Sequence, residues 1–357
     1  MYARFATILG TLLVALPVLL AGCDARPAAR AAPLVGQFVR LSDGRRLHLK
    51  CSGHGRPTVI LESGFAATAR AWFKVQPIVA QTTLVCSYDR AGYGLSDGGP
   101  LPRDGRAVVN DLDQALRRAN IGGPFVLVGH SAGALYMQLF ADRRPNEVVG
   151  MVLVDPSVKY QDRRFADAFG PGAGSIDRLR ARAVACLHAA QRRALPSLDP
   201  ALVACTPRPT AGHPAPNAAD LANALRPDNW RTQISELDTL WGATSDEVSD
   251  GRSSYGDMPL VVLTADGTYS AAPPSLQKPL LKFWRQLHAE IAARSSRGIA
   301  RLVTHSSHLM MLDRPDAIIK AIQEVITQSR HSIASTSPLR TNHAPTTSNR
   351  PSAPPSK

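Results

Sequence analysis

The ligand motifs of the common metal and phosphate sites are missing from this sequence. It contains no His-Glu-x-x-His and no paired Cys-x-x-Cys, and its cysteines and histidines are scattered along the chain. No glycine-rich phosphate loop or dinucleotide fingerprint follows an early strand. Lysine and arginine do not form a block interleaved with aromatic residues, as they do on nucleic-acid surfaces. We therefore expect no metal, no cofactor and no nucleic-acid partner.

Acidic residues are scarce relative to basic ones. Asp and Glu number 28 against 41 Lys and Arg, which gives a formal net charge of +13. Because the basic charge is scattered, mostly as arginine, we interpret it as a surface that lies near anionic lipid. The composition is otherwise that of a globular protein, with 44% hydrophobic and 19% charged residues.

The N-terminus has the pattern of an export signal. Arg4 is followed by an apolar run over residues 5–20, which is too short for a comfortable membrane span. Leu20-Ala21-Gly22-Cys23 resembles a bacterial lipobox, in which the cysteine is diacylated. We predict a lipoprotein of the bacterial cell envelope with a signal peptide over residues 1–22, a lipid anchor at Cys23 and a tether over residues 23–32. The alternative is an ordinary signal peptide in which Cys23 is incidental.

Export would place the four remaining cysteines in an oxidising compartment, where an even set allows two disulfides. Four cysteines can pair in three ways. We favour Cys51–Cys86 and Cys186–Cys205, because the first pair lies on two strands that we expect to be neighbours. The alternative is four buried thiols.

Short apolar strands alternate with amphipathic segments through most of the chain. This alternation predicts an α/β fold with a mostly parallel sheet and helices on both faces. Strands are expected at residues 35–41, 46–51, 58–61, 83–87, 126–128, 148–154, 260–264 and 299–303. Helices are expected at residues 71–80, 108–119, 176–192, 234–240, 276–294 and 317–328.

The alternation breaks after Pro156. Residues 158–256 contain helical fragments separated by Pro- and Gly-rich joints, which predicts an inserted, mainly helical cap. The core then comprises residues 33–157 and 257–329. Residues 330–357 are rich in Ser, Thr and Pro with few apolar residues, so we expect a disordered tail.

One stretch indicates the chemistry. The apolar residues 126–128 lead into Gly129-His130-Ser131-Ala132-Gly133, and a helical pattern follows. A G-x-S-x-G pentapeptide at a strand-to-helix turn holds its serine at a strained corner with the hydroxyl exposed. We therefore predict that Ser131 is a nucleophile. The alternative is a chance match of the pentapeptide.

With this turn, the alternating strands and a late histidine, residues 35–329 resemble the α/β-hydrolase superfamily. The likeness is greatest to a subgroup with Ser-Tyr-Asp-Arg-Ala-Gly-Tyr-Gly, which stands here at residues 87–94. The resemblance implies an eight-stranded, mostly parallel sheet, a lid and a serine–acid–histidine triad. It also implies activity on esters, amides or related acyl compounds.

The resemblance indicates His308 as the base. Ser306-Ser307-His308 follows the last strand and leads into Asp313-Arg314-Pro315, which resembles the family's small-small-His loop before a helix. His305 is a weaker candidate nearby, and His130 is expected to pack beside Ser131.

The acid of the triad has two candidates. Asp155 directly follows the strand expected at residues 148–154, and several branches of the superfamily place the acid of the triad at the end of this strand. Asp266 follows the strand at residues 260–264, where the family often carries its acid, although the usual position falls at Thr268. We favour Asp155 and keep Asp266 as the alternative.

An oxyanion hole needs two backbone N–H groups aimed at the developing charge. The resemblance assigns these to Ala132, which follows the nucleophile, and to Phe65, in a loop that has Ser63 where the family has histidine. We expect Glu62 to be a structural acceptor, and Asp89 and Arg90 to form a buried pair.

These residues predict a serine hydrolase that cleaves a carboxylic ester or related acyl bond of a small-molecule substrate. The first alternative is an aminopeptidase of the proline iminopeptidase type, in which Asp162, Asp167 or Glu236 would hold the substrate's amine. The second is a catalytically silent binding protein with the same fold. Trp230, Trp241 and Tyr255 are candidates for an apolar pocket or for plain packing.

Overall fold

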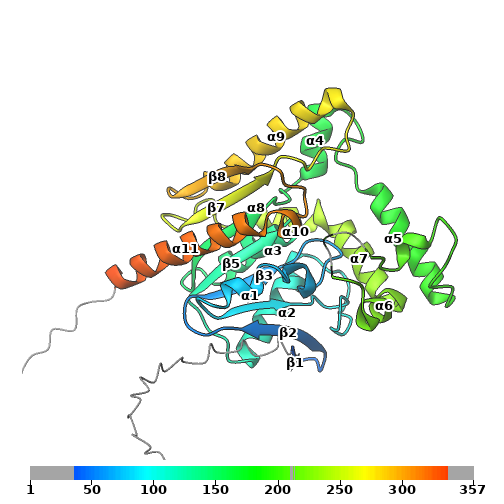
Figure 1. Cartoon of the computed structure of the whole chain (residues 1–357), viewed down its shortest axis with the longest axis horizontal. Helices are drawn as coiled ribbons and strands as arrows, with labels where there is room; N and C mark the ends of the chain where they lie inside the picture. The colour runs from blue at the N-terminus through cyan, green and yellow to red at the C-terminus, as the bar shows by residue number, and fades with distance from the viewer. Residues whose placement is uncertain (1–35, 210–211, 213, 337–357) are drawn as a thin grey trace, which may run out of the picture. The chain divides into compact units, whose positions relative to one another are not determined.

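The computed structural model describes residues 36–209, 212 and 214–336. Eight strands form one sheet in the order β1-β2-β4-β3-β5-β6-β7-β8 (Figure 1). Strand β2 is antiparallel to both of its neighbours, β1 and β4, and all other neighbouring strands are parallel. The expected fold class is therefore confirmed. The strands are β1 (Gln37–Arg40), β2 (Arg46–Ser52), β3 (Thr58–Glu62), β4 (Val85–Tyr88), β5 (Phe125–His130), β6 (Val148–Val154), β7 (Leu260–Ala265) and β8 (Gly298–Val303).

Helices connect the strands, and the longer ones overlap the expected positions, although α7 starts at Pro227 and not at residue 234. They are η1 (Ala69–Trp72), α1 (Gln76–Val79), α2 (Gly105–Arg118), α3 (Gly133–Arg143), α4 (Gln161–Phe169), α5 (Asp177–Gln191), η2 (Val203–Cys205), α6 (Ala218–Leu225), α7 (Pro227–Leu240), α8 (Ala243–Asp250), α9 (Pro274–Ala292), α10 (Met310–Asp313) and α11 (Pro315–Thr336). Two expectations were wrong. The helix expected at residues 71–80 is two short helices, and α11 continues to Thr336, through residues expected to be disordered. The rest of that tail, residues 337–357, lies outside the described residues.

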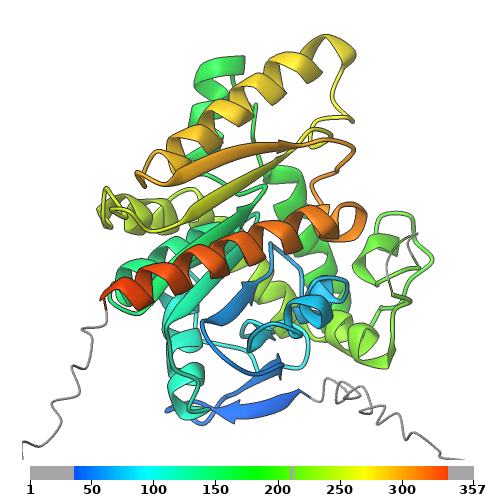
Figure 2. The same cartoon turned by 60° about the vertical axis from the view of Figure 1, so that its left-hand side comes forward.

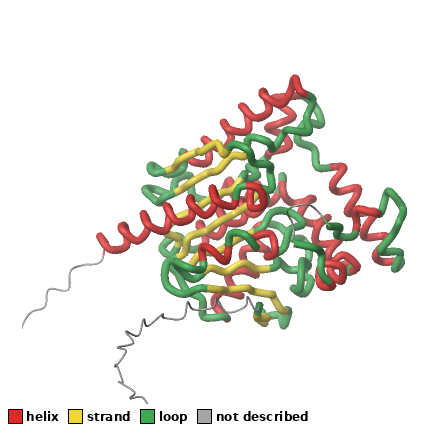
Figure 3. The backbone as a smooth tube through the Cα atoms, in the orientation of Figure 1, coloured by secondary structure: helices red, strands yellow, loops and turns green. Residues whose placement is uncertain are grey.

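Helices cover both faces of the sheet (Figures 2 and 3). Successive side chains of a strand point to opposite faces, so the central strands contribute to two apolar clusters. Ile60 and Leu127 belong to the cluster formed with α2, α3 and α9. Val59 and Val128 belong to the cluster formed with η1, α1, α10 and α11. Burial on both faces fixes the register of the central strands.

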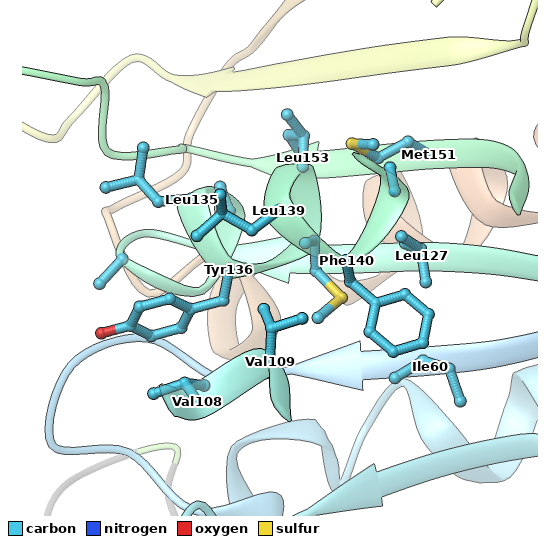
Figure 4. Packing of buried hydrophobic residues seen from close by; sticks show 14 of the residues in the cluster. Ile60, Val108, Val109, Leu127, Leu135, Tyr136, Leu139, Phe140, Met151 and Leu153 are labelled. Carbon is cyan, nitrogen blue, oxygen red and sulfur yellow. The ribbon is translucent and has the colours of Figure 1, made fainter. Parts of the chain in front are cut away.

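Helix α3 is held against the middle of the sheet. Residues 133–141 are all buried, and Phe140 packs edge to face on Phe125 of β5 at 5.8 Å between ring centroids. Figure 4 shows Met151 and Leu153 of β6 beside this helix. The start of α3, which follows Ser131 directly, therefore has little freedom to move.

The segment between β6 and β7 divides into two parts by its packing. Helix α4 lies on the core, because Phe165 contacts Phe283 and Trp284 of α9. Trp241 and Tyr255 also belong to the main core cluster. By contrast α5, η2 and α7 form a separate small apolar cluster, to which Trp230 belongs. The segment therefore packs partly on the core and partly in an apolar cluster of its own.

Both expected disulfides are present in the structure. Cys51 and Cys86 are register partners on β2 and β4, which places their side chains on the same face of adjacent strands. Cys186–Cys205 joins α5 to η2 inside the small cluster. Among the described residues, no helix has the length and apolar character needed to cross a membrane. The expected signal peptide, Cys23 and the tether lie outside the described residues.

Candidate active site

The chain turns sharply between β5 and α3, and Ser131 stands at the turn. Ser131 has φ +52°, a conformation that strains a residue with a side chain and turns its hydroxyl out of the sheet. The flanking glycines make this turn sterically allowed. A Cβ on Gly129 would lie 2.8 Å from the Ala134 Cα, and one on Gly133 would lie 2.6 Å from the Ser63 carbonyl oxygen.

The side chains of Ser131, His308 and Asp155 form one hydrogen-bonded chain. His308 Nε2 lies 3.0 Å from Ser131 Oγ, and His308 Nδ1 lies 2.6 Å from Asp155 Oδ2. Asp155 is fully buried, whereas the side chain of His308 is 39% exposed. This is the geometry of a serine nucleophile, a base and an orienting carboxylate.

Asp155 follows β6 and is held by several donors. The Thr268 hydroxyl donates to Oδ2 at 2.6 Å, and the Trp284 indole and the Ala265 amide donate to Oδ1 at 2.9 and 3.1 Å. Burial alone would raise the pKa of Asp155, but its hydrogen bond to His308 and the charge of that ring bring the pKa below its usual value. The carboxylate therefore remains ionised beside the histidine.

Asp266, the alternative acid, stabilises the loop that carries His308. Asp266 accepts hydrogen bonds from the backbone N–H groups of His305 and Ser306, each at 3.0 Å. The structure thus brings Asp155, and not Asp266, to His308. Thr268, which stands where the family usually has its acid, donates to Asp155 instead. His305 occupies the turn with φ +56° and is not joined to Ser131.

His130 links the nucleophile turn to the base loop. Its Nε2 donates to the His308 carbonyl oxygen at 2.8 Å, and the two rings lie 4.8 Å apart. Within the described residues its Nδ1 is buried without a hydrogen-bond partner. Burial, with the charge of His308, lowers the pKa of His130 to about 3, so this ring is too weak a base to take the proton of Ser131.

His288 of α9 was not singled out from the sequence. It is fully buried, its Nδ1 lies 2.6 Å from Thr264 Oγ1, and its Nε2 donates to the Pro156 carbonyl oxygen at 3.0 Å. Burial lowers its pKa to about 4. The sequence around His288 does not indicate its contacts, because its hydrogen-bond partners lie at the ends of two strands that are distant in sequence.

The loop after β3 lies against the nucleophile. A Cβ on Gly64 would lie 3.1 Å from the Ser131 Cβ, so a larger residue would press on the serine. In the described part of the chain, the backbone N–H groups of Phe65 and Ala132 donate no hydrogen bond. Both groups are thus available to a bound ligand.

The expectation that Asp89 and Arg90 pair with each other was wrong. Asp89 accepts from His48 Nδ1 at 2.9 Å and from the Ala69 amide at 2.8 Å. Arg90 turns the other way, to Glu62 at 2.7 Å and Glu236 at 2.9 Å. The two neighbours in sequence therefore have different partners, with Asp89 bound to β2 and η1 and Arg90 bound to β3 and α7.

A cavity of about 620 Å³ opens at Ser131 and His308. Its apolar lining includes Phe65, Phe73, Leu179, Trp230, Leu309 and Met311. Arg70 and Asp220, which also line it, form an ion pair at 2.7 Å. Of the three aromatic residues that sequence reasoning singled out for a pocket, Trp230 lines this cavity, while Trp241 and Tyr255 lie in the main core.

The three acidic residues considered for binding an amine do not line this cavity. Asp162 and Asp167 lie on α4, away from the cavity lining. Glu236 is buried and accepts from Arg90 and from the Tyr93 hydroxyl at 2.8 Å. In the part of the chain that the structure describes, no cluster of His, Cys, Asp or Glu is arranged to hold a metal ion.

Comparison with known proteins agrees with this fold. The chain matches the alpha/beta hydrolase family over residues 54–321. An AB hydrolase superfamily protein of Gibberella zeae is 36% identical over 131 residues, which cover 34% of this chain and 41% of that protein. An uncharacterized protein of Schizosaccharomyces pombe is 32% identical over 156 residues, which cover 36% of this chain and 29% of that protein. The matched stretches thus span less than half the length of either relative.

A solved structure titled epoxide hydrolase CorEH has a similar fold, with a TM-score of 0.54 and 16% identity over 82% of this chain and 99% of that one. The fold and the site together define a hydrolase of the α/β class. The chain belongs to the alpha/beta hydrolase family.

Proposed function

We propose that this protein is a serine hydrolase that cleaves a carboxylic ester or related acyl bond through an acyl-enzyme on Ser131. The observation that carries the proposal is the continuous hydrogen-bonded chain from Ser131 through His308 to the buried Asp155. A half-buried serine at a strained turn, hydrogen-bonded to an imidazole that is itself held by a buried carboxylate, is the arrangement that activates a hydroxyl for attack on a carbonyl.

The proposed reaction follows from the positions of these groups. His308 Nε2 takes the proton from Ser131 Oγ as the oxygen attacks the acyl carbon, and Asp155 stabilises the resulting imidazolium. The N–H groups of Phe65 and Ala132 bind the oxyanion of the tetrahedral intermediate. His308 then gives its proton to the leaving group, and the acyl-enzyme is hydrolysed by a water that His308 activates in the same way.

The cavity favours an acyl compound over a peptide with a free amine. Its lining near Ser131 is largely apolar, and Asp220, its acidic member, is paired with Arg70. Glu236 is paired with Arg90, so the site lacks the free carboxylate that an aminopeptidase would need to hold the substrate's amine. A p-nitrophenyl ester should therefore be turned over much faster than a proline naphthylamide. The reverse order would favour the aminopeptidase.

Labelling with a fluorophosphonate tests the nucleophile. The wild type should be labelled and Ser131→Ala should not, whereas the control Ser270→Ala, which removes an exposed serine, should be labelled like the wild type. Equal labelling of Ser131→Ala and wild type would end the proposal. A folded wild type that turns over no member of a broad ester panel would instead favour the catalytically silent binding protein.

We also propose that the protein acts at the bacterial cell envelope, anchored through an acylated Cys23. Cys51–Cys86 and Cys186–Cys205 support export, because disulfides persist in oxidising compartments. The excess of arginine supports a position close to anionic lipid.

A further inference from the structure

The guanidinium of Arg90 uses all of its hydrogen-bond donors inside the protein. Nε donates to Glu236, Nη1 donates to Glu62 and to the Ser63 carbonyl at 2.7 Å, and Nη2 donates to Glu236 and to the Gly64 carbonyl at 2.9 Å. A guanidinium has five N–H donors in a rigid fork, so its orientation here is fully determined. Its side chain is 2% exposed.

Two of these bonds end on the loop that carries the proposed oxyanion donor. The Gly64 carbonyl and the Phe65 N–H belong to the same peptide group, which is planar and trans. The carbonyl and the N–H of such a group point in opposite directions. When Arg90 fixes the Gly64 oxygen, it therefore also fixes the direction of the Phe65 N–H. A charged donor on the carbonyl oxygen also polarises the peptide and makes its N–H a stronger donor.

Carboxylates from two distant elements hold the arginine in place. Glu62 ends β3, and Glu236 lies on α7 of the segment between β6 and β7. Both are buried, and the hydroxyls of Tyr88 and Tyr93 donate to Glu62 and Glu236 respectively. The guanidinium also lies over the rings of Tyr93 and Tyr136, at 4.8 and 5.4 Å. Through Glu236, the insertion is connected to the loop beside Ser131.

We propose that Arg90, held by Glu62 and Glu236, is a positioning residue that aims and polarises the Phe65 N–H of the oxyanion hole. This inference rests on the proposed function, since it requires an oxyanion to form at Ser131. It gives α7 a role in the reaction beyond lining the cavity. Arg90 does so without touching the substrate, because the Gly64–Phe65 peptide lies between them.

The effect should appear in the transition state more than in substrate binding, because the oxyanion forms only during the reaction. Arg90→Lys keeps the charge but loses the planar fork. We expect kcat for a p-nitrophenyl ester to fall about 10- to 100-fold with KM nearly unchanged, given that loss of one oxyanion donor costs about 100- to 1,000-fold. The affinity for a trifluoromethyl ketone, which binds as an oxyanion, should fall by a similar factor.

Arg103→Lys is the matched control. Arg103 is also 2% exposed and pairs with Asp111 at 2.7 Å, but it makes no contact with the loop at residues 63–65. It should alter thermal stability without the selective loss of kcat. Glu236→Gln keeps the shape of Arg90's partner and removes its charge. It should lower kcat and the inhibitor affinity in the same way as Arg90→Lys, but by a smaller factor. If Arg90→Lys does not fold, Glu236→Gln provides the measurement.

Equal effects of Arg90→Lys and Arg103→Lys, or a loss that appears in KM, would overturn the inference. If Arg90→Lys does not fold, a Glu236→Gln variant with wild-type kcat and inhibitor affinity would also overturn it. Ser131→Ala, measured in the same assay, separates this failure from that of the proposed function. If Ser131→Ala retains turnover, the proposed function fails. If Ser131→Ala is inactive while Arg90→Lys has wild-type kcat, the positioning role alone fails.

Discussion

At the scale of single residues, Asp155 combines burial with a full set of donors. An asparagine in its place would keep an oxygen that accepts from the Trp284 indole and the Ala265 amide. It would, however, turn an N–H towards His308 and leave the protonated imidazole without a negative charge beside it. Asp266 accepts its hydrogen bonds from two backbone N–H groups, and an asparagine in its place could still accept one of them through its oxygen. The two carboxylates therefore differ in what their substitution should do.

We expect Asp155→Asn to lower kcat/KM for an ester by about 1,000- to 10,000-fold, because it removes the charge that orients and stabilises the protonated base. Asp266→Asn should lower it less than about 10-fold, through small shifts of the base loop. Steady-state kinetics of the two purified variants would check this. If Asp266→Asn is the more damaging of the two, then the assignment of the acid is wrong.

The residues of the site differed in how far the sequence could predict them. Ser131 and His308 stand in local motifs, so their proximity followed from the order of the elements. The choice between Asp155 and Asp266 depended on Thr268 and on neighbouring strands, which no local pattern contains. The partner of Arg90 could not be predicted, because Glu236 lies 146 positions away on a helix of the insertion.

At the scale of elements, α9 is fastened to the sheet through a buried histidine. His288 reaches Thr264 at the end of β7 and Pro156 just after β6. Since Nε2 carries the proton that it donates to a carbonyl, Nδ1 accepts from the threonine hydroxyl and the ring is neutral. Protonation of the second nitrogen would break this arrangement.

His288→Gln should remove a pH-dependent part of the stability. The pKa of His288 is about 4 in the fold and about 6.5 when exposed, so the unfolded chain binds the extra proton first as the pH falls. Stability from the neutral ring is complete above pH 6.5 and is lost as the pH falls towards 4. The wild type should lose about 2 kcal/mol relative to the variant between pH 7 and pH 5.

Urea denaturation at pH 7, 6 and 5 would measure this difference, with His188→Gln as a control at an exposed position of α5. The comparison with the wild type isolates one histidine from other groups such as Glu62, whose pKa burial raises to about 7. Parallel pH profiles of wild type and His288→Gln would contradict the prediction.

The elements themselves were predicted unequally. The central strands were foreseen almost to the residue, because burial on both faces produces continuous apolar runs. The helix expected at residues 71–80 is divided, since Pro77 stands in the first turn of α1 and its ring favours a helix start there. The C-terminal part of α11 was missed, because its polar residues indicated a tail although the preceding turns were already helical.

At the scale of the whole molecule, the proposed lipid anchor at Cys23 determines where the protein is located and takes no part in catalysis. Cys23→Ser should move the protein from the membrane fraction of a bacterial host to the soluble fraction, because each buried methylene of an acyl chain contributes about 0.8 kcal/mol to membrane binding. Ester hydrolysis per molecule should be unchanged, since the catalytic residues all lie in the unit Leu34–Lys357, which does not include Cys23. Fractionation followed by an activity assay would check both parts, and a variant that stays in the membrane fraction would exclude Cys23 as the sole anchor.

Helix α11 has a practical consequence. It begins just after the loop that carries His308, and its far end lies where the central strands begin, so that Ser329 donates to the Val149 carbonyl and Arg330 to that of Arg56. Its 22 residues span about 33 Å. A bead, an electrode or a fusion partner coupled at the end of α11 would therefore approach from the side remote from the cavity, which makes the end of this helix the suitable handle for immobilising the protein with its active site open.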